Sequence, residues 1–344
     1  MAKIVTLGEI MMRLSPPGYE RFEQATQFDV YYGGGEANVA CSLAQFGHEV
    51  SFVTKLPENA LGSSAIAFLR SLGVDCSHVV RGGNRIGIYF LENGASVRAS
   101  SVIYDRAESS MAQAVPEDFD FDSIFEGKDL FHVSGITAVL SPACGKIAVE
   151  AVKAAKRHGV IISLDLNYRA KLWKDHIPEK QQVMQTLMEL SDICFGNALD
   201  AAKCCGYTDH RHDFLQEDYN TCVEEKAMCD VVKAYHLKYL VTSLRNNISA
   251  SDNGWSAEVC DGSRLYKGKT FQLHIVDRVG GGDSFAAGFL HAVLAGAQED
   301  PQYAIEFAIA AAAIKHTLPG DVNYTSVSEV EQLAFGSSAG RINR

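Results

Sequence analysis

Short apolar and β-branched runs alternate along this chain with stretches of helical periodicity, and this alternation restricts the folds open to it more than any other feature. Predicted strands lie at residues 3–10, 49–54, 129–134 and 160–165, and predicted helices at residues 36–46, 61–72 and 144–158. Strand–helix–strand units join parallel strands, and the run at 160–165 is typical of a strand buried on both faces. The sequence therefore predicts an α/β fold with a mostly parallel central sheet.

Two segments, residues 13–32 and 86–106, break this pattern. In the second, residues 88–91 and 97–104 flank a turn at residues 92–94, which predicts an antiparallel hairpin. We expect both segments to form a small β lid, inserted in a core of residues 1–12, 33–85 and 107–344, over the carboxyl ends of the parallel strands where such sheets bind ligands. The lid's unpaired strand edges favour a homodimer formed through the lid.

The amino-acid composition limits the kinds of molecule that this chain can bind. The chain has 344 residues, of which 47% are apolar, enough for a large core, and its net charge is −11. This charge argues against binding to nucleic acid or to an anionic membrane, and makes any local group of arginines notable. No apolar run approaches the ~20 residues that span a bilayer. The first strand begins at residue 3 without a basic region or cleavage site before it, so we expect a cytoplasmic protein.

Cysteine and histidine patterns give no metal site. The nine cysteines never occur in C-x-x-C spacing and mostly lie in apolar segments, so we expect reduced, packed thiols. Residues 208–218 are polar and predict a surface loop, in which His210 and His212 are expected to be solvated rather than to bind metal.

The segment DRVGGGD at residues 277–283 precedes an apolar helix. Consecutive glycines leave backbone N–H groups accessible at a helix N-terminus, where phosphate binds well. A carboxylate at Asp283 is out of place beside phosphate unless it takes a proton from an approaching group. The alternative is that Asp283 is only an N-cap.

A second glycine cluster, GGGEANVA at residues 33–40, also precedes a predicted helix, although taken alone it is as well explained by a tight turn. Neither cluster gives G-x-G-x-x-G, because Asn38 and Phe285 replace the third glycine, and neither continues as a P-loop. A nicotinamide dehydrogenase is therefore disfavoured.

Together the two clusters resemble the signatures of the PfkB (ribokinase-like) carbohydrate kinases. Asp277, Gly280, Gly282 and Asp283 match the family's D-x-x-G-x-G-D pattern, residues 33–38 resemble its N-terminal glycine signature, and residues 197–200 resemble its N-x-x-E/D element. The resemblance covers the whole chain. It implies a three-layer α/β/α core with a β lid, and catalysis of phosphoryl transfer from ATP with Mg²⁺.

Within the family, residues 104–106, 165–169 and 315–323 are similar to segments of 2-keto-3-deoxygluconate kinases. Such a substrate carries a carboxylate, which Arg106 and Arg169 would bind through charge-assisted hydrogen bonds; each arginine alone could instead form a surface ion pair. A family member acting on a neutral sugar such as fructose, and a non-catalytic sugar or nucleotide binder, remain the alternatives.

The resemblance assigns roles by position. Asp283 would be the general base, and the N–H groups of Gly280, Gly281 and Gly282 would hold charge on the transferred phosphoryl group. The residues expected to contact the sugar are Gly34, Gly35, Asn38, Tyr89, Tyr104, Arg106, Arg169 and Asp283. Glu9 could replace an aspartate that many relatives have after the first strand.

The nucleotide side follows in the same way. Residues expected to contact ATP are Asn167, Arg169, Asn197, Ser243, Arg245, Gly280 and Gly282. Asn197 and Asp200 would orient Mg²⁺ through water, and carbonyls around residues 277–279 could hold a monovalent cation such as K⁺, as in some relatives. Two departures stand out: TSLRNNI at 242–248 replaces the glycine-containing T-x-G-x-x-G loop, and Arg278, which would touch ATP phosphates or face solvent, enters the D-x-x-G-x-G-D motif.

Overall fold

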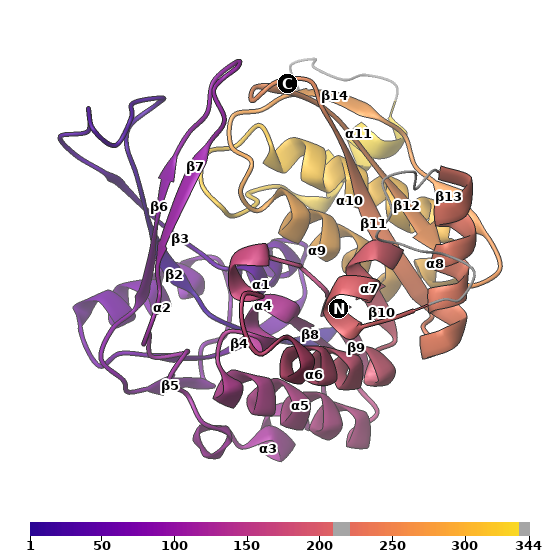
Figure 1. Ribbon diagram of the computed structural model, residues 1–344, viewed down its shortest axis with the longest axis horizontal. Helices are drawn as coiled ribbons and strands as arrows, with labels where there is room; N and C mark the ends of the chain where they lie inside the picture. The colour runs from indigo at the N-terminus through magenta and orange to yellow at the C-terminus, as the bar shows by residue number, and fades with distance from the viewer. Residues whose placement is uncertain (209–220, 337–344) are drawn as a thin grey trace.

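The computed structural model describes residues 1–208 and 221–336 (Figure 1). The predicted loop at 208–218 and its histidines lie almost wholly outside these residues, apart from Thr208. The protein has one large sheet, one small sheet and helices on both faces of the large sheet. This arrangement confirms the predicted α/β fold.

The large sheet has ten strands in the order β13-β12-β11-β10-β9-β8-β1-β4-β5, with β14 paired to β12. All neighbours from β5 to β11 are parallel, whereas β12, β13 and β14 are added antiparallel at one edge. The strands are β1 (Lys3–Leu7), β4 (Glu49–Leu56), β5 (Val79–Arg81), β8 (Leu130–Ser134), β9 (Ile161–Asp165), β10 (Ile193–Phe195), β11 (Tyr239–Asn247), β12 (Asp252–Cys260), β13 (Leu265–Lys267) and β14 (Phe271–His274).

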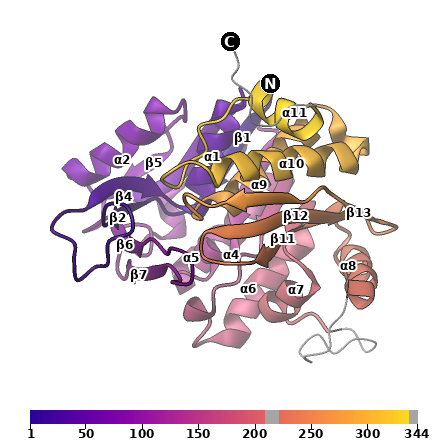
Figure 2. The same cartoon turned by 90° about the horizontal axis from the view of Figure 1, so that it is seen from above.

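The central strands are buried on both faces, which explains their unbroken apolar runs: every residue of β8 is buried. One helical layer consists of α1 (Gly35–Gln45), α2 (Ala60–Ser71), α9 (Gly281–Leu294), α10 (Pro301–Lys315) and α11 (Val327–Phe335). The other consists of α3 (Phe121–Phe125), α4 (Gly135–Ala138), α5 (Pro142–Arg157), α6 (Ile177–Leu190), α7 (Ala198–Cys205) and α8 (Thr221–Tyr235). Figure 2 shows α9, α10 and α11 on one side of β11 and β12, and α6, α7 and α8 on the other. Two hydrophobic cores therefore lie on opposite faces of the sheet.

Helix α10 is buried on all sides, because it packs between α9 and α11 as well as on the sheet. No helix within the described residues is long and apolar enough to cross a membrane. The cysteines at 41, 76, 144, 194, 204, 205 and 260 are buried free thiols, and Cys229 is partly exposed.

The small sheet has the order β3-β2-β6-β7. Its strands are β2 (Met11–Ser15), β3 (Asp29–Gly33), β6 (Gly87–Glu92) and β7 (Ser101–Asp105), which lie together on one side of the molecule in Figure 1. β6 and β7 form the predicted antiparallel hairpin. The second strand begins at Ser101 rather than at Val97, whose side chain is 98% exposed, so the tight turn expected at 92–94 is wrong and a longer connection joins the strands.

Candidate active site

A cavity of about 580 Å³ lies at the carboxyl ends of β1, β8, β9 and β10, facing lid residues from β6 and β7. Among the residues predicted to bind sugar, ATP or Mg²⁺ or to act in catalysis, Gly281 alone does not line it; of the segment 277–279, predicted to hold a monovalent cation, Arg278 and Val279 line it and Asp277 does not. Gly281 is buried behind the cavity, where a Cβ atom would collide with the ring of His316. The fold thus brings residues from the two glycine clusters, the lid and the ends of the strands into one place.

Asp283 is the third residue of α9 and does not cap that helix; Gly280 is the N-cap, with no side-chain hydrogen bond. The Asp283 carboxylate instead accepts a hydrogen bond of 2.7 Å from Nδ2 of Asn38, on α1. Burial raises the pKa of Asp283 to about 7, although the bond from Asn38 opposes the rise. A base with this pKa is half ionised near neutral pH, which suits proton abstraction. The geometry therefore favours the base over the simple N-cap.

The loop before α9 requires glycine at position 280. Its φ is 80°, and a Cβ atom there would collide with the backbone oxygen of Asp321. The Asp277 carboxylate holds the loop by accepting hydrogen bonds of 3.0 Å from the N–H groups of Val279 and Gly320. No side chain caps α9, and the N–H of Gly281 donates to the backbone oxygen of Arg278 at 3.5 Å, whereas the N–H groups of Gly282 and Asp283 remain available to an anion bound in the cavity.

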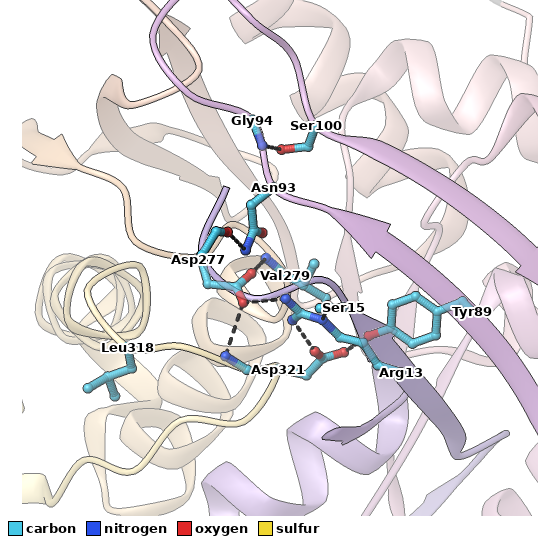
Figure 3. A network of polar contacts seen from close by, with 12 residues as sticks. Arg13, Ser15, Tyr89, Asn93, Gly94, Ser100, Asp277, Val279, Leu318 and Asp321 are labelled. Carbon is cyan, nitrogen blue, oxygen red and sulfur yellow. Dashed lines mark hydrogen bonds and ion pairs between the residues drawn. The ribbon is translucent and has the colours of Figure 1, made fainter. Parts of the chain in front are cut away.

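A buried ion network supports this loop from the lid (Figure 3). The guanidinium of Arg13, on β2, makes ion pairs of 2.7 Å with Asp277 and with Asp321, and its Nε donates to Ser15. Tyr89, on β6, donates its hydroxyl hydrogen to Asp321. Arg13, Asp277 and Asp321 are each at most 4% exposed. The small sheet is therefore attached to Asp277, whose carboxylate holds the glycine loop, and to Asp321, whose backbone oxygen lies against Gly280.

On the sugar side, the two predicted arginines differ. Nε of Arg106 donates to Glu9 at 2.8 Å, and Glu9 also accepts the hydroxyl hydrogen of Ser109. Arg169 has a hydrogen bond only to the backbone oxygen of Tyr168 and, within the described part of the chain, forms no ion pair. Arg169 is thus the more available ligand for a carboxylate, whereas Arg106 is already neutralised by Glu9.

The two predicted tyrosines also differ. Tyr89 is 4% exposed and its hydroxyl is used by Asp321, while Tyr104 is 46% exposed and its ring lies 5.9 Å from that of Tyr89. Both rings line the cavity. Tyr89 can therefore offer a ligand its ring, and Tyr104 can offer ring and hydroxyl.

On the nucleotide side, residues 242–247 were expected to form a loop, but they continue strand β11 and pair with β12. Arg245 lies over the ring of Trp255 at 5.3 Å, and Arg278 donates to the backbone oxygens of Ser249 and Ala250. Burial, and then the charges of Arg278 and Arg169, lower the pKa of Arg245. Such a group of like charges is stabilised by an anion, and the guanidinium group fits a phosphate through two parallel hydrogen bonds.

The residues predicted to orient Mg²⁺ form the capping box of α7: Asn197 accepts from the N–H of Asp200, and Asp200 accepts from the N–H of Asn197. No group of three acidic, histidine or cysteine side chains within the described residues could bind a metal by itself. The buried Oδ1 of Asn167 has no hydrogen-bond partner. This sparse set of oxygens fits Mg²⁺ that keeps several waters and phosphate oxygens.

Sequence reasoning assigned no role to three carboxyl groups that line the cavity: Glu36, Asp165 and Asp321. Burial raises the pKa of all three, that of Asp165 to about 7. Glu36 accepts hydrogen bonds from the N–H and hydroxyl of Ser134. Asp165 and Asp321 lie in the segments similar to sugar-acid kinases, which was the signal that could have found them; Glu36 directly follows the first glycine cluster.

The sequence profile of the pfkB family carbohydrate kinases matches residues 1–326. The chain belongs to this family. Its structure is similar to that of 2-dehydro-3-deoxygluconokinase from Thermotoga maritima, with a TM-score of 0.90, 46% sequence identity, and coverage of 97% of this chain and 98% of that one. The fold and family predicted from the sequence are confirmed.

Other relatives of this pfkB kinase have names that indicate related substrates. It is 31% identical over 339 residues to 2-dehydro-3-deoxygalactonokinase from Haloferax volcanii, with 98% of each chain covered. It is 28% identical over 314 residues to 5-dehydro-2-deoxygluconokinase from Geobacillus thermodenitrificans, with 90% of this chain and 86% of the relative covered.

Proposed function

We propose that this pfkB kinase transfers the terminal phosphoryl group of ATP to 2-keto-3-deoxygluconate (2-dehydro-3-deoxy-D-gluconate), giving the 6-phosphate. One observation carries the proposal: a single cavity contains a carboxylate suited to act as a base, Asp283, and an arginine that forms no ion pair with any described residue, Arg169. The names of the relatives support a deoxy keto sugar acid as the substrate.

In this reaction Asp283 takes the proton of the attacking hydroxyl group, and Asn38 keeps the carboxylate oriented. The N–H groups at the start of α9 stabilise charge on the transferred phosphoryl group. Asn167, Asn197, Ser243 and Arg245 line the nucleotide side of the cavity. Asn197 and Asp200 would hold Mg²⁺ through water, and the ion would supply charge neutralisation at the phosphates. Closure of the lid would exclude water that could hydrolyse ATP.

Arg169 separates the acid substrate from a neutral sugar. A hexose such as fructose has no charge for it to bind, so the exposed guanidinium of Arg169 would gain no charge-assisted contact from a neutral sugar. The carboxylate of a keto acid would instead gain charge-assisted hydrogen bonds. A binder without chemistry has no need of a base at position 283.

The test is an ADP-release assay with Mg²⁺ and ATP on 2-keto-3-deoxygluconate, 2-keto-3-deoxygalactonate, 5-keto-2-deoxygluconate, fructose and ribose. We expect turnover on the first substrate, reduced at least ~10²-fold in Asp283→Asn, as for loss of a general base. Turnover on fructose but on no keto acid would contradict the substrate assignment. Binding of a keto acid without turnover would contradict the kinase.

The lid supports a homodimer. β3 and β7 are the edges of the small sheet, and they or their flanks expose Phe28, Val30 and Ile103 at 38%, 54% and 53%. Light scattering after size exclusion tests this: Val30→Glu with Ile103→Glu should give monomer. The control is Ile248→Glu, at a residue 64% exposed outside the lid, which should leave the dimer intact. A dimer that survives the lid substitutions would place the interface elsewhere.

A further inference from the structure

Lys315, the last residue of α10, is a fully buried cation to which the proposed reaction assigns no role. Its Nζ donates to the backbone oxygen of Leu318 at 3.3 Å. Its Cε lies 3.2 Å from the position that a Cβ atom would take on Gly280. The side chain therefore lies directly against the back of the glycine loop, on the side away from the cavity, which it does not line.

Lys315 lies among carboxylates and one other cation. The carboxylates that act on it most strongly are those of Asp277 and Asp321, and both are also paired with Arg13. Burial lowers the pKa of Lys315, while the two carboxylates oppose this shift by favouring the ammonium form. Two cations, Lys315 and Arg13, thus face the carboxylates of Asp277 and Asp321 in the protein interior, and the carboxyl group of Asp283 is the next to act on Lys315. Without Lys315 the group would carry a net negative charge directly behind the loop that must hold a phosphoryl group.

The family resemblance places a monovalent cation at carbonyls around residues 277–279, and behind that segment the ammonium group of Lys315 already supplies a cation while the neighbouring oxygens are in use. Both oxygens of Asp277 are occupied: Oδ1 by the N–H of Val279, and Oδ2 by the N–H of Gly320 and by Arg13. The backbone oxygen of Leu318 is taken by Lys315. A compact ammonium group needs the same oxygen ligands that such an ion would need.

We propose that Lys315 is a tethered cation that takes the place of a monovalent ion behind the Gly280 loop. It positions the backbone N–H groups of that loop, so that phosphoryl transfer needs no K⁺. Lys315 is a positioning residue, since it acts through the loop and does not touch the reacting atoms. The kinetic part of the test rests on the proposed kinase function.

The first measurement is the kcat of the unmodified enzyme in KCl and in choline chloride at equal ionic strength. The two values should agree to within about fivefold, the lower end of ordinary coupling between sites. Activation by K⁺ above that range overturns the proposal, and this result does not depend on any variant folding.

The second measurement uses Lys315→Ala, which leaves room for an ion, and Lys315→Met, which fills the space without charge. Both should lower kcat by about tenfold or more, less than the ~10²–10³ for loss of a direct donor, with little change in the KM of the sugar acid. K⁺ should restore Lys315→Ala and not Lys315→Met. The control is Lys269→Ala. Lys269 also donates to a backbone oxygen, that of Ala334, but lies away from the loop. This variant should show neither the loss of kcat nor a response to K⁺.

Full activity of Lys315→Ala without K⁺ would overturn the proposal, as would a loss that no monovalent ion restores. If the unmodified enzyme turns over no sugar, the proposed function fails, and the melting temperature with Mg²⁺ and ADP becomes the readout. The nucleotide should then stabilise Lys315→Ala more in KCl than in choline chloride, and stabilise the unmodified protein equally in both. Equal shifts in the variant would overturn the inference independently of turnover.

Discussion

Replacing Asn38 with leucine should move the acidic limb of the pH–activity profile to higher pH. Nδ2 of Asn38 donates to Asp283 over 2.7 Å, and this bond holds down a pKa that burial raises to about 7. A hydrogen bond to a charged group contributes about 1.5–3 kcal/mol, and about 1.4 kcal/mol corresponds to one pKa unit. Loss of the bond should therefore raise the pKa of Asp283 by about one to two units.

The sign follows from the role of the base. Asp283 must be ionised to take a proton, so activity falls as the pH drops below its pKa. Raising that pKa from about 7 to about 8–9 lowers the ionised fraction at pH 7 about fivefold to fiftyfold, whereas by about pH 10 most of the loss should be regained.

The assay is kcat/KM for the sugar acid against pH, which reports groups of the free enzyme. Ser42→Ala is the control, because Ser42 lies on the same helix, bonds to the backbone oxygen of Asn38 and leaves Asp283 untouched. Its limb should stay in place. If the limb of a folded Asn38→Leu enzyme also stays in place, Asp283 is not the titrating base. Asp165, whose pKa is also raised to about 7, would then be the group to test.

Three further results are expected. Arg169→Ala and Arg106→Ala should both raise the KM of the sugar acid. Only Arg106→Ala should lower the melting temperature markedly, because it leaves the buried carboxylate of Glu9 unpaired, at a cost of about 3–5 kcal/mol. Equal melting temperatures of the two variants would contradict the pairing. Gly280→Ala should destabilise the fold through its positive φ and a collision with backbone, whereas Gly282→Ala, which meets no atom within 4 Å, should leave the melting temperature nearly unchanged. Asp283→Asn should stabilise the protein more at pH 8 than at pH 5. The pKa of Asp283 is about 7 in the folded protein and 3.8 ordinarily, so ionisation of this group lowers the stability of the folded protein as the pH rises between these values, by at most about 4 kcal/mol. A difference in melting temperature between variant and unmodified protein that does not change with pH would refute this.

The sequence predicted those features that depend on local pattern. Apolar runs buried on both faces predicted the parallel strands, and glycine clusters before helices predicted the starts of α1 and α9. Both features are encoded locally, because burial on both faces requires a run of apolar residues and a tight backbone turn requires glycine.

Features that depend on contacts across the chain were missed. The pairing of Arg106 with Glu9 joins residues 97 positions apart, and that of Arg13 with Asp321 joins residues 308 apart. Residues 242–247 were expected in a loop because relatives have glycine there, but pairing with β12 extends the strand, and this pairing is visible only in the fold.

The ion pairs also connect the composition to the site. The chain carries a net charge of −11, yet Asp277 and Asp321 are paired with Arg13 and lie close enough to Lys315 to act on it, and Glu9 is paired with Arg106. Three arginines that form no ion pair within the described residues, Arg169, Arg245 and Arg278, line the cavity. An acidic protein that places three such arginines in one cavity is suited to hold two anionic substrates together, and ATP with a sugar acid is such a pair.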